Sequence, residues 1–393
     1  MDMKNKKQFL TTLSLLLLFS IGLALRLLFL PANTIDMKVF NLKWYDYIVN
    51  HGIFNAIGDE FSNYTPPYLY LLSLATLTKS FLPKLTAIKL IPITFDLINS
   101  ILVYQIVKTN FGKGIKPALA GMIFWILPTV IINGSFWGQV DGLYTCFLLL
   151  CLLLLLKDHR IAAVIAFSIS FAIKAQAFFI LPLLAVLLFK KRIPWQAFLL
   201  TPLVYFIMMV PALLAGRSIT SLASVYLTQA ETFNSAAKNA ANFYFFLPPN
   251  AYQAAVMIGL PLAGLLLLTW ILIYGFKRYP ITPAILTTTA LISLALTPFL
   301  LPKMHDRYFY PADVFSLVGA FFVPEIWFVS IAYQLISLLS YIPFLFGVNP
   351  QATLPIAILI NVTTIVFLLW KQWNMTSNHF KREKATVEKE DNN

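Results

Sequence analysis

Apolar runs long enough to cross a lipid bilayer occupy most of this chain of 393 residues, and they limit the folds open to it. The chain is 59% hydrophobic and only 11% charged, which is unlike the composition of a soluble globular protein. Helices satisfy their own backbone hydrogen bonds inside lipid. The sequence therefore predicts an all-α, polytopic integral membrane protein.

The number of apolar runs predicts about 12 membrane-spanning helices. We place them near residues 8–30, 86–107, 117–132, 142–156, 160–173, 175–189, 195–215, 251–276, 281–301, 308–323, 326–346 and 353–371. The first run is longer than the core of a signal peptide and has no clear small-residue cleavage site. We therefore expect a retained anchor at the N-terminus.

The segment 66–82 decides the orientation, because a crossing there would invert every later loop. If this segment lies in or dips into the membrane interface, most Lys and Arg residues fall in short loops on one side, as the positive-inside rule requires. This arrangement predicts a multi-pass protein of the cell (inner) membrane with both termini in the cytoplasm. It also accounts for the net charge of +13 without a nucleic-acid partner.

Two long external segments follow from this topology. The first, 31–85, contains a rough apolar stripe between Asp36 and Val49 that predicts an interfacial helix. The second, 216–250, is polar and fits either a mobile lid or a solvated connector. The expected organisation is a membrane module over 1–320, further spanning helices over 321–373 and a charged cytoplasmic tail over 374–393.

Polar side chains, which are costly near hydrocarbon, gather at the rims of these apolar runs. In the predicted topology they all fall on the external side, in four clusters. The clusters are Asp36; Trp137 with Gln139 and Asp141; Lys174 with Gln176; and Lys303 with His305, Asp306 and Arg307. Carboxylate, amide, imidazole and guanidinium groups at one face favour chemistry there.

The first three clusters also have structural interpretations. Asp36 is either a general base just above the lipid or the N-cap of a helix. Trp137 is either a substrate contact or an interfacial anchor, and Asp141 either a substrate contact or a helix cap. Gln139 has no comparable structural role. Lys174 either binds an anionic group or extends its ammonium to the interface.

The fourth cluster lies in the segment 302–311, between two prolines, and it points to an anionic ligand. The planar guanidinium of Arg307 matches the geometry of a phosphate. His305 and Lys303 supply further donors or positive charge. Surface decoration would not require this combination, so we expect a phosphate-binding role.

Three motifs resemble known membrane enzymes. An early aspartate followed by Asn63-Tyr-Thr-Pro-Pro-Tyr-Leu-Tyr70 resembles the GT-C superfamily, integral-membrane glycosyltransferases that use polyprenyl-phosphate sugars. The stretches Gly134-Ser-Phe-Trp-Gly-Gln-Val-Asp141 and Met304-His-Asp-Arg-Tyr-Phe-Tyr-Pro311 are similar to the bacterial PIG-V-like mannosyltransferases. The resemblance runs from residue 1 to about 320. The chain departs from the pattern at Asp306, where relatives usually have glutamate, and at Thr65, where they have proline.

The resemblance implies a GT-C-like fold and the transfer of a hexose, mannose by similarity, with inversion. The donor would be a polyprenyl-phosphate sugar in the membrane lipid, and the acceptor a glycolipid, polysaccharide or protein. Asp36 would be the catalytic base. Substrate contacts would come from Tyr64, Trp137, Gln139, Asp141, Lys174 and Gln176, and donor-phosphate contacts from Lys303, His305 and Arg307. No cofactor is implied, and the adjacent acidic pair that holds a metal in other branches is missing after Asp36.

Other functions fit part of the pattern. A transporter or a lipid-linked oligosaccharide flippase would also have about 12 spans, but it would place polar residues at the bilayer midplane. Only Asp96 is clearly central, and we expect it to be structural, either protonated or paired with a polar neighbour such as Asn99. An oligosaccharide polymerase or ligase would share the compartment and the lipid-linked substrate.

Overall fold

The computed structural model describes residues 3–231 and 234–390 and is nearly all α-helical. The chain forms two compact units, each built from two stretches of sequence. The first unit contains Met1–Phe178 and Trp195–Ser235, and the second contains Phe179–Pro194 and Ala236–Asn393. Since the chain passes between the units three times, neither unit is a continuous segment.

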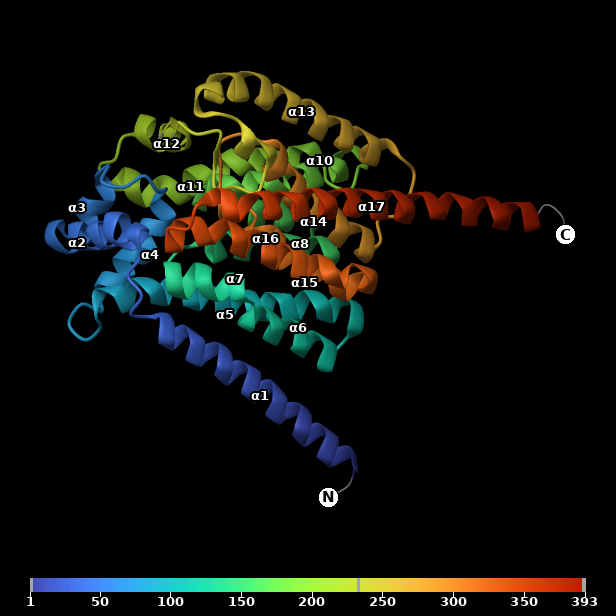
Figure 1. Cartoon of the computed structure of the whole chain (residues 1–393), viewed down its shortest axis with the longest axis horizontal. Coiled ribbons are helices and arrows are strands. Elements are labelled where there is room, and N and C mark those ends of the chain that lie inside the picture. The colour runs from blue at the N-terminus through green and yellow to red at the C-terminus, as the bar shows by residue number, and fades with distance from the viewer. Residues whose placement is uncertain (1–2, 232–233, 391–393) are drawn as a thin grey trace. The chain divides into compact units, whose positions relative to one another are not determined.

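In chain order, the first helix of the first unit is α1 and the last is α12 (Figure 1). The α-helices are α1 (Met3–Phe29), α2 (Leu42–His51), α3 (Ile53–Gly58), α4 (Pro66–Thr76), α5 (Lys84–Phe111), α6 (Ile115–Ile126), α7 (Pro128–Ile131), α8 (Asp141–Leu156), α9 (Arg160–Ile173), α11 (Leu200–Leu214) and α12 (Ile219–Glu231). Two wider π-helical turns are η1 (Met37–Asn41) and η2 (Ile132–Trp137), and two 3₁₀ turns are η3 (Ala175–Ile180) and η4 (Trp195–Leu199). In its core, α5 packs against α6 and α8, and α9 packs against α8 and α11.

The second unit is built around α14 (Pro283–Leu300), which is almost completely buried. The other helices are α10 (Leu181–Phe189), α13 (Tyr252–Phe276), α15 (Tyr310–Phe322), α16 (Trp327–Phe346) and α17 (Leu354–Glu390), with the short turns η5 (Phe243–Phe246), η6 (Pro249–Ala251), η7 (Pro324–Ile326) and η8 (Pro350–Ala352). Helix α14 packs against α10, α13, α15 and α17. Two strands of two residues, β1 (Ala237–Lys238) and β2 (Met304–His305), pair in parallel.

Helix α10 is tied to α14 although the two are far apart in the sequence. The Leu183 backbone N–H donates to the Ser293 hydroxyl at 3.2 Å, across 110 residues. That hydroxyl in turn donates to the Phe179 carbonyl at 2.8 Å. The stretch Phe179–Pro194, which contains α10, is therefore an integral part of the second unit.

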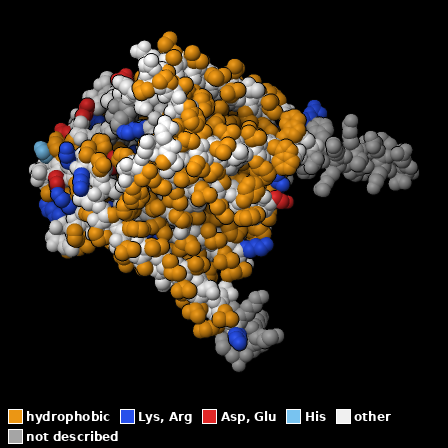
Figure 2. All heavy atoms as spheres, viewed as in Figure 1, with side chains coloured by type: hydrophobic (Ala, Val, Ile, Leu, Met, Phe, Trp, Pro, Cys, Tyr) orange, Lys and Arg blue, Asp and Glu red, His pale blue; other side chains and the backbone are white. Residues whose placement is uncertain are grey.

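Membrane-spanning character is clear for a subset of the helices. Among the described residues, seven helices are long and apolar enough to cross a bilayer, or eight if the bent pair Ile115–Ile126 and Pro128–Trp137 counts as one span. Figure 2 shows hydrophobic side chains over much of the visible surface. Large exposed apolar side chains, for example Met257 and Leu214, are more numerous here than on the surface of a water-soluble protein. The chain is therefore a membrane protein.

The predicted count of about 12 spans stays a prediction. Each predicted apolar run falls on a helix, but the helices Asp141–Leu156, Arg160–Ile173, Ala175–Phe189 and Tyr310–Phe322 are shorter than 18 residues. They rise about 20 to 24 Å, less than the ~30 Å hydrocarbon core. The run 117–132, expected as one helix, bends by 47° because Pro128 interrupts it.

The segment 66–82, which sets the predicted orientation, contains only the 11-residue helix α4. A helix of that length rises about 16 Å, roughly half of the hydrocarbon thickness. Seven of its residues are buried in the first unit, and turns lead from it to Pro83. Helix α4 alone is therefore shorter than a full crossing, and the orientation stays a prediction.

A buried ion pair joins α1 to α5. The Arg26 guanidinium lies 3.1 Å from the Asp96 carboxylate, both side chains are inaccessible, and the guanidinium stacks 3.5 Å above the Trp125 ring centre. The pairing expected between Asp96 and Asn99 is wrong, since Asn99 donates to the Gly142 carbonyl instead. Asp96 thus has a structural role, and its partner comes from the first helix.

Candidate active site

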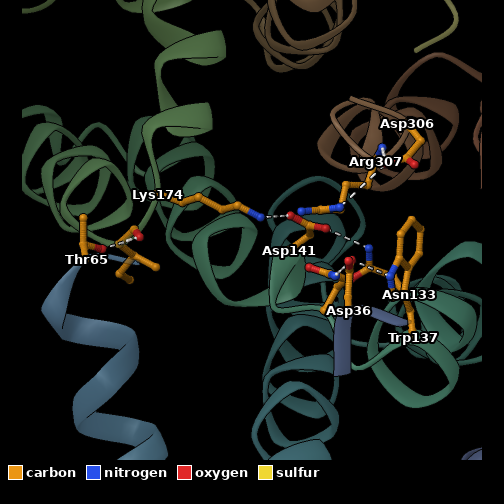
Figure 3. Close-up of polar contacts among 10 residues, drawn as sticks. Asp36, Thr65, Asn133, Trp137, Asp141, Lys174, Asp306 and Arg307 are labelled. Carbon is orange, nitrogen blue, oxygen red and sulfur yellow. Dashed lines mark hydrogen bonds and ion pairs between the residues drawn. The ribbon is translucent and has the colours of Figure 1, made fainter. Parts of the chain in front are cut away.

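Asp36 stands at the start of η1, but its side chain does not cap the helix. Its Oδ2 atom accepts a hydrogen bond from Trp137 Nε1 at 2.9 Å and another from Gln139 Nε2 at 2.6 Å (Figure 3). The N-cap interpretation is therefore wrong. Asp36 is partly buried, and the three residues form what we call the Asp36 cluster. The indole and the amide both help to orient this partly accessible carboxylate.

The turn after η2 brings both donors to Asp36. Gly138 has a positive φ of 79°, and a Cβ atom at this position would lie 2.1 Å from the Met37 side chain. Only glycine accepts this combination of backbone conformation and close approach. The Gln139 N–H donates to the Asn133 carbonyl at 2.9 Å and closes the turn. The glycine in this motif therefore lets η1 pack directly on the turn.

Lys89 fastens the two segments of the cluster to each other, and sequence analysis missed it. Its ammonium donates to the carbonyls of Phe29 at 2.9 Å, Ala32 at 2.6 Å and Phe136 at 3.2 Å. The first two carbonyls lie between α1 and Asp36, and the third lies next to Trp137. A fully buried lysine thus joins the chain before Asp36 to the turn that holds its carboxylate.

Further bonds strengthen this connection. The Thr34 hydroxyl donates to the Trp137 carbonyl at 3.0 Å, and the Asn41 amide donates to the Gly138 carbonyl at 3.3 Å. Trp137 is completely buried, so its predicted alternative as an interfacial anchor is wrong. Its indole N–H donates to Asp36, and its backbone carbonyl accepts from Thr34.

Asp141 lies two residues after Gln139, at the start of α8, and its environment differs from that of Asp36. Its carboxylate is fully buried, forms an ion pair with the Lys174 ammonium and accepts a bond of 2.8 Å from the Asn133 amide (Figure 3). We call these three residues the Asp141 cluster. The snorkelling interpretation of Lys174 is wrong, because its ammonium points to a buried carboxylate. Asn133 is buried as well and was not among the predicted site residues.

Tyr64 and Gln176 are the two remaining residues that were predicted to contact the substrate. The Tyr64 ring centre lies 5.8 Å from the Lys174 ammonium and 5.3 Å from the Trp44 ring. Gln176 lies in η3, and its Oε1 atom is buried without a hydrogen-bond partner among the described residues. The neighbouring Tyr68 is fully buried, and this burial raises the pKa of its phenol.

The second unit holds the predicted phosphate-binding residues in and just after β2. The Lys303 and Asp306 N–H groups donate to the Ala236 and Lys238 carbonyls at 2.7 and 2.9 Å. These bonds fix the segment 303–307, which we call the basic segment, onto the chain at β1. Lys303 has a positive φ of 64°, an uncommon conformation for a residue with a side chain.

The three basic side chains of this segment, Lys303, His305 and Arg307, are partly accessible, whereas Asp306 is buried. An Arg307 guanidinium nitrogen lies 3.7 Å from the Asp306 carboxylate (Figure 3), and the Arg307 backbone N–H donates to that carboxylate at 2.9 Å. The His305 ring lies 5.1 Å from the Tyr308 ring. Arginine, histidine and lysine side chains therefore come from one short, hydrogen-bonded segment.

Neither cluster of the first unit nor the basic segment resembles a metal centre. Among residues 3–231 and 234–390, no three His, Cys, Asp or Glu side chains come together as a ligand set. No protein-family model matches the chain, and a comparison with curated proteins finds no significantly similar sequence.

Proposed function

We propose that the chain is an integral-membrane glycosyltransferase that takes a hexose from a polyprenyl-phosphate sugar. Mannose is the sugar implied by the motifs, and the acceptor is a hydroxyl group on the extracytoplasmic face. The observation that carries this proposal is the Asp36 cluster, in which Trp137 and Gln139 hold one carboxylate oxygen at 2.9 and 2.6 Å. A fixed, partly accessible carboxylate is the group that hydroxyl activation needs.

In this reaction the acceptor oxygen attacks the anomeric carbon from the face opposite the phosphate. Its proton passes to the Asp36 carboxylate as the new carbon–oxygen bond forms. The bond from the anomeric carbon to the phosphate oxygen breaks, and its electron pair leaves with the polyprenyl phosphate. Attack on the opposite face inverts the anomeric configuration, and no cofactor enters the balance.

Charge develops on the departing phosphate, and we assign the basic segment to this charge. Arg307, His305 and Lys303 provide donors and positive charge, the requirement for stabilising a leaving phosphate. Their common segment is hydrogen-bonded at Lys303 and Asp306, which limits its reorganisation. Of the three, Arg307 is best suited to bind the phosphate, because a guanidinium matches phosphate geometry with two parallel donors.

Lys174 has a different role in this scheme. Because it forms an ion pair with buried Asp141, we assign both residues to holding α8 and the end of α9 together. Asn133 connects this pair to the turn that carries Trp137 and Gln139. The Asp141 cluster therefore positions the Asp36 cluster, and Asp36 remains the residue assigned to proton transfer.

The test is transfer of label by purified protein in lipid nanodiscs. The donors are radiolabelled mannosyl- and glucosyl-polyprenyl phosphate, and the acceptors are the membrane glycolipids and polysaccharide of the host. We expect wild-type transfer, a loss of about 10²- to 10⁴-fold in Asp36→Asn, and a strong loss in Arg307→Ala. Asp46→Asn is the matched control, since Asp46 is an exposed carboxylate of the same segment, paired with Lys84.

Equal transfer by Asp36→Asn and wild type would refute the role of Asp36. If neither donor gives transfer, the same labelled lipids are placed in liposomes with the protein. Movement of label across the bilayer without transfer would replace the proposed enzyme by a lipid-linked sugar flippase. That result would also remove the need for a base at residue 36.

A further inference from the structure

A hollow of about 320 Å³ lies on the first unit, beside η1 and α2. Its lining contains four aromatic side chains, Phe40, Trp44, Tyr47 and Phe61. Val39, Lys43 and Asn63 complete it. The volume is at the small end of the range for small-molecule sites. Charged side chains gather around this end of the unit in Figure 2, whereas the hollow itself is mainly aromatic.

The hollow follows the helical stretch that begins at Asp36. Phe40, Trp44 and Tyr47 are spaced by four and three residues, which places them on one face of the helix. Asp36 precedes Phe40 by four residues, about 6 Å along the helix axis. A ligand in the hollow is therefore bound by the same short helix that carries the candidate base.

The aromatic rings are fixed by one another. The Tyr47 ring stacks on Phe61 with ring centres 4.5 Å apart and on His51 at 3.9 Å. The Tyr47 hydroxyl donates to the Asp59 carboxylate at 2.8 Å. Aromatic faces are electron-rich and attract the C–H groups of sugar rings, which carry partial positive charge. Fixed rings bind such a ligand with little loss of side-chain entropy.

Polar groups in the lining distinguish a sugar from a lipid chain. The Asn63 Oδ1 atom is buried and has no donor among the described residues. The Lys43 ammonium is exposed at the other side of the lining. A sugar hydroxyl can donate to the first group and another can accept from the second. An acyl chain offers neither, and it would leave the buried amide oxygen unsatisfied.

We propose that this hollow binds a neutral oligosaccharide, the acceptor glycan of the reaction proposed above. Only its assignment as acceptor rests on the proposed function, since the argument for sugar binding uses the lining alone. The partly accessible Phe40 and Phe61 rings contact the sugar rings, and Asn63 and Lys43 bind their hydroxyl groups. The chain would then recognise its acceptor through the helix that follows its catalytic base.

The test separates binding from catalysis. Saturation-transfer NMR is recorded on Asp36→Asn protein in nanodiscs, with mannotetraose and maltotetraose as probes. We expect transfer to the C–H protons of at least one probe, and an affinity about fivefold weaker in Phe61→Ala and in Lys43→Ala. Phe54→Ala is the control, because Phe54 is 65% exposed and lies outside the hollow. Thermal unfolding of each variant checks that it is folded.

Absence of transfer to both probes, or equal effects of Phe61→Ala and Phe54→Ala, would overturn the inference. So would protection of Lys43 from acetylation by phosphatidylglycerol in the nanodisc without glycan binding, since the occupant would then be a lipid headgroup. Glycan binding by a protein that transfers no label would refute the proposed function and leave this inference standing. Unchanged acceptor KM in an active Phe61→Ala enzyme would refute the inference alone.

Discussion

Asp36 and Asp141 contact opposite ends of the same turn, yet their surroundings differ. Asp36 is partly accessible and accepts hydrogen bonds from the Trp137 indole and the Gln139 amide. Asp141 is inaccessible and is held by a lysine ammonium and an amide. A fully buried carboxylate is out of reach of an incoming hydroxyl, whereas a partly accessible one can receive its proton. The difference in burial supports the separate roles proposed for the two motif aspartates.

The largest expected effect comes from breaking the ion pair of Asp141. Lys174→Met removes the ammonium that pairs with the buried Asp141 carboxylate, and breaking such a buried pair costs about 3–5 kcal/mol of stability. Thermal unfolding in detergent measures this loss. The double variant Asp141→Asn with Lys174→Met restores most of it, because no unpaired charge remains. A stable Lys174→Met protein would contradict the structural role of the pair.

Removing one of the groups that donate to Asp36 tests whether the orientation of this carboxylate matters for activity. Gln139→Leu deletes a hydrogen bond to a charged group, worth about 1.5–3 kcal/mol, so we expect transfer activity to fall by about 10- to 100-fold. The unfolding temperature should change little, because Asp36 is partly accessible and water can replace the lost amide donor. Wild-type activity in this variant would show that Gln139 does not position the base.

Lys89 allows the connection between the segments to be broken without touching either carboxylate. Lys89→Met removes the shared donor of three carbonyls, and unsatisfied buried acceptors cost about 1–3 kcal/mol. Activity and stability should therefore decrease together, unlike in Gln139→Leu. Kinetics and unfolding measured on the same preparation distinguish the two patterns. Loss of neither property would mean that Asp36 is held without Lys89.

The smallest effect is expected at an exposed carboxylate. Asp46 and Lys84 form an ion pair at 2.7 Å, but each side chain is 49% exposed. Such pairs contribute about 0–1 kcal/mol, because water and salt screen them. Lys84→Met should therefore change both stability and transfer only slightly. A large change in either property would mean that accessibility does not separate the carboxylates of this segment.

The helical architecture was predictable because hydrophobic runs leave a strong signal. The helix after Asp36 also follows from local sequence, whereas the bend at Pro128 inside the run 117–132 was missed. The lengths of α8 and α9 were predictable as well, since the runs expected at 142–156 and 160–173 nearly coincide with these helices.

The site was predictable as a set of residues but not as a set of bonds. Asp36, Gln139 and Asp141 were singled out, and the structure brings all three to one turn. Lys89 and Asn133 were missed as site residues because their partners are backbone carbonyls and a carboxylate eight residues away, which form no motif. Lys174 pairs with an aspartate 33 residues away, a distance at which spacing carries no information.

The bond between Leu183 and Ser293 has a consequence for synthesis of the protein. Helix α10 leaves the ribosome before its partner α14, and 110 residues separate the two bonded groups. At 5–20 residues per second, roughly 5 to 20 seconds pass before α14 is available. During this interval α10 must wait in the membrane with its future interface covered by lipid or by the insertion machinery. The second unit is therefore completed only late in translation, although one of its helices is among the earlier ones to be made.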